Sequence, residues 1–144
     1  MSTEDNKAVV QSYFDARTAG DLAACDEIFA SEFIRNTVDG SYTSGPDDAK
    51  DIIVRWRTAF SDYQDTVISL VADGDMVAAH ILFTGTHDGV FEFAGRGPWA
   101  PTNKSIRIWE FFVYRLRNRK IVEASAGWDW QRLINQLGID EAVS

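Results

Sequence analysis

Near its C-terminal end the chain places one acidic residue, Asp129, directly between Trp128 and Trp130. If the carboxyl group of Asp129 points into an apolar cavity, loss of water disfavours its ionised form and raises its pKa. Such a group takes and returns protons near neutral pH, so Asp129 is a candidate general acid/base. A second interpretation remains open on these residues alone. Asp129 precedes a predicted helix at 131–136 and is suited to cap it by accepting free backbone amides.

The predicted final strand, residues 120–128, alternates between two kinds of side chain. One face carries Glu123, Ser125, Gly127 and Asp129, and the other carries Ala124, Ala126 and Trp128. Small residues beside the acid leave space for a ligand, which favours catalysis. They would equally allow a helix to pack closely on that face, which favours a structural role.

The two histidines, His80 and His87, lie seven residues apart on one predicted strand. They therefore point to opposite faces of the sheet, which disfavours a shared metal site. His87 is the better functional candidate because it ends its strand, where we expect the mouth of a pocket; a hydrogen-bonded structural histidine is the common alternative. The sequence has no phosphate-binding glycine pattern, paired-cysteine motif or nucleophile elbow, so no motif in it supports the common nucleotide and zinc chemistries. Proton transfer in a dry cavity is favoured over covalent catalysis.

The composition of the chain limits the classes of partner that it is expected to bind. The chain has 144 residues, of which 45% are apolar, and we expect one compact domain over residues 1–144. A formal net charge of -8 argues against binding to nucleic acid and against attraction to an anionic membrane. The sequence has no membrane-spanning apolar run and no signal-peptide pattern, so we expect a cytoplasmic protein. The single cysteine, Cys25, follows two alanines and is predicted to be a small core residue.

Helical periodicity comes first along the chain and long strands follow. We predict a first helix that begins near Thr3 and ends near Gly20, a short second helix capped by Asp21, and a third that begins after Ser44. Strands are predicted at 67–71, 76–86, 105–116 and 120–128, before a short terminal helix. This order indicates an α+β fold, in which helices cover one face of a curved sheet.

The order and spacing of several short motifs resemble the SnoaL-like polyketide cyclase family, a branch of the nuclear transport factor two and ketosteroid isomerase-like superfamily. The motifs lie at 6–10, 19–22, 28–33, 45–46, 84–87, 101–104, 120–123 and 129–138. The resemblance implies a conical barrel made of a strongly curved mixed β-sheet, covered by three N-terminal helices and followed by a short C-terminal helix. Its interior would hold a hydrophobic small molecule, and we expect a homodimer or homotetramer.

Residue roles follow from the same resemblance. In the family's cyclases, the acid at the position of Asp129 is the general acid/base of an intramolecular aldol closure that uses no metal or organic cofactor. By carry-over, Asp129 would remove a carbon-bound proton and later protonate the alkoxide, while Asn36 and His87 would polarise the oxygen that gains negative charge. The side chains expected to contact the substrate are Tyr13, Phe14, Trp56, Trp99, Trp109 and Phe112.

The segment 95–104 departs from the family pattern, because it is longer and includes Trp99. We expect this segment to change the shape of the ligand that fits. The predicted function is a cofactor-independent cyclase or isomerase that acts on a polyketide-like carbonyl compound in secondary metabolism, such as antibiotic biosynthesis. The alternatives are an epoxide-opening or hydroxylase-like enzyme and a non-catalytic small-molecule-binding protein.

Overall fold

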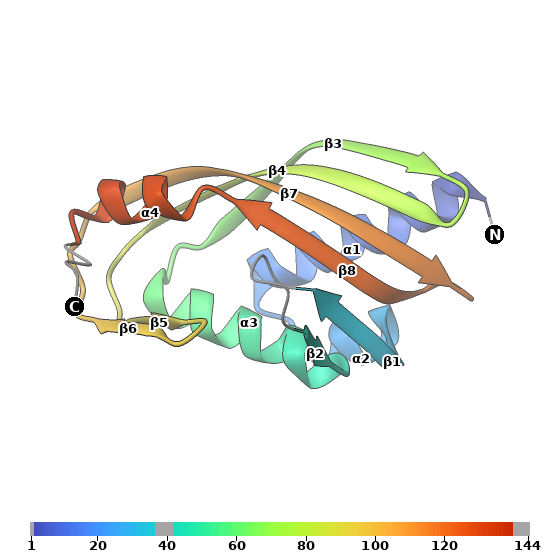
Figure 1. Cartoon of the computed structure of the whole chain (residues 1–144), viewed down its shortest axis with the longest axis horizontal. Helices are drawn as coiled ribbons and strands as arrows, with labels where there is room; N and C mark the ends of the chain where they lie inside the picture. The colour runs from blue at the N-terminus through green and yellow to red at the C-terminus, as the bar shows by residue number, and fades with distance from the viewer. Residues whose placement is uncertain (1, 37–41, 140–144) are drawn as a thin grey trace.

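A computed structural model describes residues 2–36 and 42–139, and Figure 1 shows a long curved sheet above the helices α1 and α3. The helices of this part are α1 (Thr3–Ala19), α2 (Ala24–Ile28), α3 (Pro46–Ala59) and α4 (Trp130–Leu137). The strands are β1 (Phe29–Asn36), β2 (Tyr42–Ser44), β3 (Gln64–Asp73), β4 (Met76–Thr86), β5 (Phe91–Phe93), β6 (Arg96–Trp99), β7 (Ser105–Arg117) and β8 (Lys120–Trp128). The predicted α+β class is confirmed.

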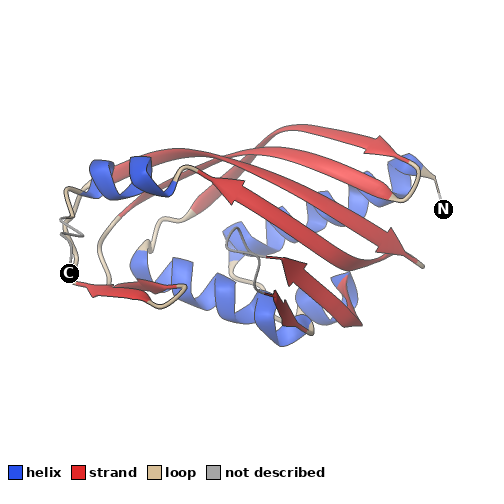
Figure 2. Ribbon diagram, viewed as in Figure 1, coloured by secondary structure: helices blue, strands red, loops and turns tan. Residues whose placement is uncertain are grey.

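The main sheet is mixed and open. Its strand order is β2-β1-β8-β7-β4-β3, in which β1 and β8 run parallel while the other neighbours run antiparallel. Because β2 lies at one edge and β3 at the other, the sheet does not close on itself (Figure 2). The expected conical barrel is therefore not confirmed. The architecture is a curved open sheet with helices on one face.

The N-terminal helices begin and end largely where the sequence indicated. Ser2 and Asp5 form a capping box at the start of α1, and Gly20 ends it in the left-handed conformation. The second helix is shorter than predicted, because Phe29 already belongs to β1, and β1 and β2 both precede α3. A cover of three consecutive helices is thus not confirmed. None of the helices in the described ranges is long and apolar enough to cross a membrane.

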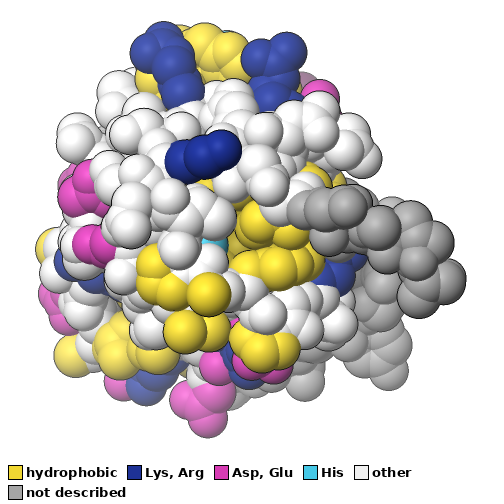
Figure 3. Space-filling model, turned by 90° about the vertical axis from the view of Figure 1, so that its left-hand side faces the viewer, with side chains coloured by type: hydrophobic (Ala, Val, Ile, Leu, Met, Phe, Trp, Pro, Cys, Tyr) yellow, Lys and Arg dark blue, Asp and Glu magenta, His cyan; other side chains and the backbone are white. Residues whose placement is uncertain are grey.

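Two short strands, β5 and β6, form a separate hairpin within residues 91–99, where no strand was predicted. The hairpin lies beside α3 at the end of the molecule that also carries α4 (Figure 1). Figure 3 looks onto this end and shows apolar side chains gathered in its centre and lower part. Phe91 and Phe93 pack inward from the hairpin, against Trp56 of α3. The hairpin therefore closes one end of the core.

Strand β7 decides which side chains enter the core. Along its length buried and exposed residues alternate almost without exception, because successive side chains point to opposite faces. The inner face carries Ile106, Ile108, Glu110, Phe112, Tyr114 and Leu116, and the outer face carries Arg107, Trp109, Phe111 and Val113. The inner row runs past two buried apolar clusters, one beneath α1 and one beside α3 and α4. One acidic residue, Glu110, therefore lies among core side chains.

Candidate functional site

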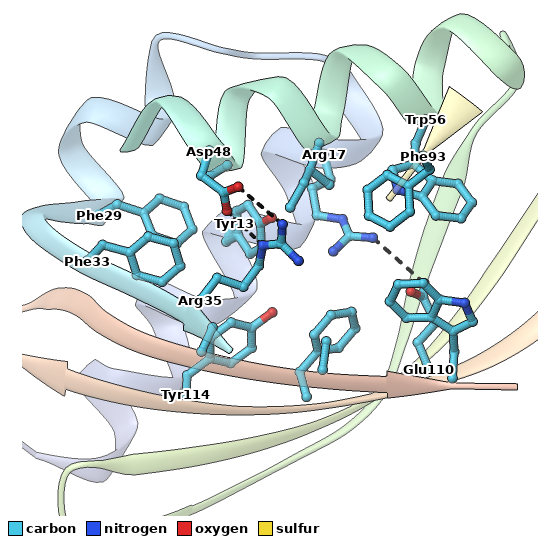
Figure 4. Close-up of a pocket in the computed structure, with 16 residues that line it drawn as sticks. Tyr13, Arg17, Phe29, Phe33, Arg35, Asp48, Trp56, Phe93, Glu110 and Tyr114 are labelled. Atoms are coloured by element: carbon cyan, nitrogen blue, oxygen red, sulfur yellow. Dashed lines mark hydrogen bonds and ion pairs between the residues drawn. The ribbon is translucent and has the colours of Figure 1, made fainter. Parts of the chain in front are cut away.

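A narrow cavity lies between the two apolar clusters (Figure 4). The empty space between its walls, its opening included, is about 470 Å³, and the centre of a water molecule can occupy about 30 Å³ of it. Its walls come from α1, β1, α3, β5, β7 and β8. The lining residues are Tyr13, Arg17, Phe29, Phe33, Arg35, Asp48, Ala49, Ile52, Trp56, Phe93, Glu110, Phe112, Tyr114, Ala124, Ala126 and Trp128. The cavity is thus mostly apolar with a few polar groups, as small-molecule sites are.

Arg17 is the central residue of a cluster of polar side chains at one end of the cavity. It lies in the last turn of α1, is 5% exposed, and its Nε atom lies 2.7 Å from an oxygen of Asp65. The hydroxyl of Tyr63 accepts hydrogen bonds from the Arg17 guanidinium and donates one of 2.7 Å to Asp65. The Arg17 guanidinium also lies over the ring of Phe112, 5.3 Å from its centre. These contacts offset the free-energy cost of burying the charge of Arg17, and they fix the position of its side chain.

Glu110 faces Arg17 but is not fully paired with it. The nearest approach, from Nη2 of Arg17 to Oε1 of Glu110, is 3.7 Å, and this Oε1 atom has no hydrogen-bond partner among the described residues. Burial raises the pKa of Glu110 to about 8; the charge of Asp65 adds to this effect and that of Arg17 opposes it. A carboxyl group with such a pKa exchanges protons near neutral pH, which is the property that general acid/base catalysis requires.

The other end of the cavity carries a second charged pair. Arg35 of β1 and Asp48 of α3 form two hydrogen bonds, of 2.7 and 3.1 Å, with the fork geometry typical of an arginine–carboxylate pair. Both side chains are largely buried and line the cavity. Figure 4 shows this pair and Tyr114 on the side of Arg17 that faces away from Glu110. The cavity therefore has polar groups along its length, between aromatic walls.

Asp129 lies outside this cavity. Its side chain is 61% exposed and accepts a hydrogen bond of 3.0 Å from the backbone amide of Arg132, so it is the N-cap of α4. The strand alternation predicted for β8 is correct, but the cavity lies on the face of Ala124, Ala126 and Trp128. Asp129 follows on the opposite face. The apolar burial required by the acid/base hypothesis is therefore absent at Asp129.

The two residues expected to polarise the substrate oxygen also lie outside the cavity. Asn36 points toward the outer face of β8, where its amide lies 3.4 Å from the hydroxyl of Ser125. His87 is fully buried between the rings of Phe60 and Phe91. Neither residue lines the cavity. Asn36, His87 and Asp129 thus do not form one site in this structure.

His87 has an evident structural role. Its Nδ1 atom accepts a hydrogen bond of 3.2 Å from the backbone amide of Thr102, and its own backbone bonds to Asn103 and Lys104. Burial lowers the pKa of His87. These contacts tie the end of β4 to the segment that precedes β7. These contacts agree with the alternative that His87 is a hydrogen-bonded structural histidine.

Half of the residues expected to contact the substrate do line the cavity: Tyr13, Trp56 and Phe112. The other three lie elsewhere. Phe14 is buried in the hydrophobic core between α1 and the sheet. Trp99 contacts the rings of Phe91 and Trp130, at the end of the molecule that carries the β5–β6 hairpin. Trp109 lies on the outer face of β7, against His80, because its position in the strand alternation is opposite to that of Glu110.

The sequence carried a signal for Glu110 that was not used. A single acidic residue at position 110 shares its strand parity with Ile106, Ile108 and Phe112, which predicts a carboxyl group on a buried face. Its partners Arg17 and Asp65 are distant in sequence, and nothing local links them. As for metals, the described ranges hold no cluster of three or more His, Cys, Asp or Glu residues that could bind an ion.

Comparison with known proteins agrees with this fold. The structure is similar to that of AclR, a putative hydroxylase from Streptomyces galilaeus, with a TM-score of 0.82 and 25% identity over 99% of this chain and 87% of that one. It is also similar to IdmH, a putative polyketide cyclase from Streptomyces antibioticus, with a TM-score of 0.77 and 23% identity over 93% of this chain and 99% of that one.

A putative SnoaL-like polyketide cyclase from Jannaschia sp. CCS1 has a TM-score of 0.82 and 17% identity, over 94% of this chain and 92% of that one. No protein with a curated description matches the sequence. The sequence model of the SnoaL-like polyketide cyclases matches residues 7–137, which is most of the chain. The mixed sheet, the helices on one face and this match lead to one conclusion: the chain belongs to the SnoaL-like polyketide cyclase family.

Proposed function

We propose that this protein is an acid/base enzyme that closes a ring in, or isomerises, a hydrophobic polyketide-like carbonyl compound, with Glu110 as the proton-transfer group. One observation carries the proposal. The carboxyl group of Glu110, on a residue only 4% exposed, lines the narrow aromatic cavity and keeps one oxygen without a hydrogen-bond partner among the described residues. Family membership supports a polyketide cyclase scaffold for this chemistry.

The proposed reaction needs only proton transfers. Ionised Glu110 takes a proton from the carbon next to a substrate carbonyl, and the electron pair left behind forms an enolate. The enolate carbon attacks a second carbonyl of the same molecule, which forms the new carbon–carbon bond and an alkoxide. Protonated Glu110 then returns its proton to the alkoxide. In an isomerase the same proton would instead return to another carbon.

Arg17 is the positioning residue in this scheme. Asp65 and Tyr63 hold its guanidinium in place, and the Nη2 atom that donates to the Tyr63 hydroxyl also lies 3.7 Å from Oε1 of Glu110. Its positive charge opposes the rise in the pKa of Glu110 and thereby keeps the ionised form accessible near neutral pH. It also lies where negative charge gathers on a bound enolate or alkoxide.

The role that family resemblance predicts for Asp129 is a competing assignment. It requires the substrate to reach the outer face of β8, where Asp129 caps α4. Glu110 already lines a largely apolar cavity. We therefore place proton transfer at Glu110, and substitution of the two acids separates the two assignments.

Hydroxylation is a second candidate reaction. It is favoured by the similarity to AclR, which is described as a putative hydroxylase. The mass of the product separates the two reactions, because aldol ring closure and isomerisation keep the atoms of the substrate whereas hydroxylation adds oxygen. A non-catalytic binding protein would return its ligand unchanged.

The deciding experiment incubates the protein with candidate polycyclic ketone precursors and follows the products by mass spectrometry. Glu110→Gln keeps the size of the side chain but cannot carry the proton, and we expect turnover to fall by about 10²- to 10⁴-fold. Asp129→Asn is the matched control, because Asn also caps helices well, and we expect its turnover to stay near that of the wild type. Full activity in Glu110→Gln together with loss in Asp129→Asn would refute the proposal.

We also propose that the protein forms a homo-oligomer through the outer face of the sheet. That face exposes large apolar side chains, among them Phe111, which is 56% exposed, and the neighbouring Trp109 and Val113. The ring of His80 stacks on that of Phe111, which extends the flat surface. A contiguous apolar surface of this kind is typical of a face that packs against another protein. The common homo-oligomeric state implied by family resemblance supports a second copy of this chain as the occupant.

A further inference from the structure

The hydroxyl of Tyr114 is a second polar group that the proposed reaction does not use. Tyr114 is 1% exposed, lines the cavity, and its hydroxyl has no hydrogen-bond partner among the described residues. Buried tyrosine hydroxyls usually find a partner, so one without a protein partner calls for a ligand. Figure 4 shows this hydroxyl directed from β7 toward the middle of the cavity, on the side of Arg35.

Strand geometry sets the separation of the two backbone positions. Glu110 and Tyr114 are four residues apart on the inner face of β7, so their Cα atoms lie about 13 Å apart along the strand. Phe112 lies between them, and its ring stacks on that of Tyr114 with 5.8 Å between centroids. The wall between the two polar groups is therefore flat and aromatic. Such a wall is suited to stacking against an elongated, planar, apolar molecule.

The charges at the Tyr114 end indicate which group of such a molecule would fit. The positive charge of Arg35 is already matched by Asp48, with two short hydrogen bonds, and that of Arg17, which also acts on Tyr114, is matched by Asp65. Burial raises the pKa of Tyr114 well above its usual value, so the hydroxyl is a neutral donor. A ligand carboxylate would therefore bring a negative charge into a buried region in which both cations already have an acidic partner, which is costly. A neutral oxygen acceptor carries no such cost.

We propose that Tyr114 is a specificity-determining residue, whose hydroxyl donates a hydrogen bond to a neutral carbonyl oxygen at the end of the substrate opposite the reacting carbon. The substrate class is thus an elongated, planar, apolar molecule with a ketone or ester carbonyl at its far end. This inference rests on the proposed function, because Glu110 defines the reacting end. The test of this inference measures binding alone, so the inference and the proposed function can fail separately.

The test uses three anthracenes of nearly equal shape, substituted at the same carbon of an end ring with an acetyl, an isopropyl or a carboxylate group. Their binding to the full chain is followed by their own fluorescence. We expect the acetyl compound to bind about three- to tenfold more tightly than the isopropyl compound, as one neutral hydrogen bond provides, and the carboxylate to bind most weakly. Tyr114→Phe should remove the preference for acetyl over isopropyl.

Two controls keep the result interpretable. Tyr114→Phe removes a buried hydroxyl without a protein partner, so its melting temperature should equal or exceed that of the wild type. Glu110→Gln should keep the acetyl preference, even if it also keeps full turnover and thereby refutes the proposed function. The inference is overturned if Tyr114→Phe retains the preference, if the carboxylate binds most tightly, or if neither neutral compound binds the wild-type protein.

Discussion

Glu110 of β7 lies directly opposite Trp128 of β8, and both side chains line the cavity, whereas the next residue, Asp129, turns to the outer face. The indole Nε1 of Trp128 has no hydrogen-bond partner among the described residues. The acidic residue beside Trp128 in the cavity wall is thus provided by the neighbouring strand. This relationship supports the proposal of proton transfer at Glu110, and Asp129 has a capping role.

The first prediction concerns the pH dependence of turnover. Because Glu110 must be ionised to take the first proton, and its pKa is raised to about 8, kcat/KM should rise with pH and level off above about pH 8. Below that value each pH unit should lower the rate about tenfold. A pH profile of the wild-type enzyme with an active substrate checks this. A flat profile between pH 6 and pH 9 would be evidence against Glu110 as the base.

Glu110 should also affect the pH dependence of stability. In the unfolded chain a glutamate loses its proton above about pH 4.3, whereas folded Glu110 keeps it up to about pH 8. The folded state then binds more protons in this window, so the contribution of Glu110 to stability falls as pH rises. Glu110→Gln cannot ionise, and its melting temperature relative to the wild type should increase between pH 4.5 and pH 8. A constant difference across these pH values would contradict this assignment.

The capping role of Asp129 predicts an effect on stability. Asp129→Ala removes the acceptor for the Arg132 amide and should lower the free energy of unfolding by about 1 kcal/mol. Asp129→Asn should cost much less, because the amide oxygen can accept the same hydrogen bond. Urea denaturation of the two variants measures the difference. Equal stability of the Ala variant and the wild type would mean that the cap contributes nothing.

His87 predicts a loss of stability in acid. Its folded pKa is lowered by burial, so below about pH 6.5 the unfolded chain binds a proton that the folded chain excludes. The contribution of His87 to stability should therefore decline as pH falls below that value, opposite in sign to the contribution of Glu110. His87→Asn should be less stable at pH 7, because it leaves a gap between Phe60 and Phe91, but should lose this decline. His80→Gln is the control, and a decline that vanishes in it instead would refute the prediction.

The exposed sheet face predicts the behaviour in solution. Phe111→Asp places a charge in the centre of the apolar outer face and should convert an oligomer to a monomer, as measured by sedimentation velocity. Val54→Asp is the matched control, because Val54 is also exposed, at 47%, but lies on α3. A wild-type protein that sediments as a monomer would refute the proposed assembly.

Local sequence was sufficient for most secondary structure. The bounds of α1, α3, β4, β7 and β8 were predicted to within a few residues, because capping residues and strand alternation are local signals. The hairpin of β5 and β6 was missed, because its strands are short and lie among Gly and Pro. The third helix is capped at Gly45 and not at Ser44, without a side-chain hydrogen bond.

The sequence by itself determined the long helices and strands, the alternation of β7 and β8, and the family. It also determined that Trp128 and Asp129 face opposite ways, since that follows from the strand period. Only the tertiary structure decided which face is covered, because the helices that cover it contact the sheet through residues far apart in the chain. That choice buries Glu110 beside Arg17 and Asp65, and it leaves Asp129 exposed to solvent.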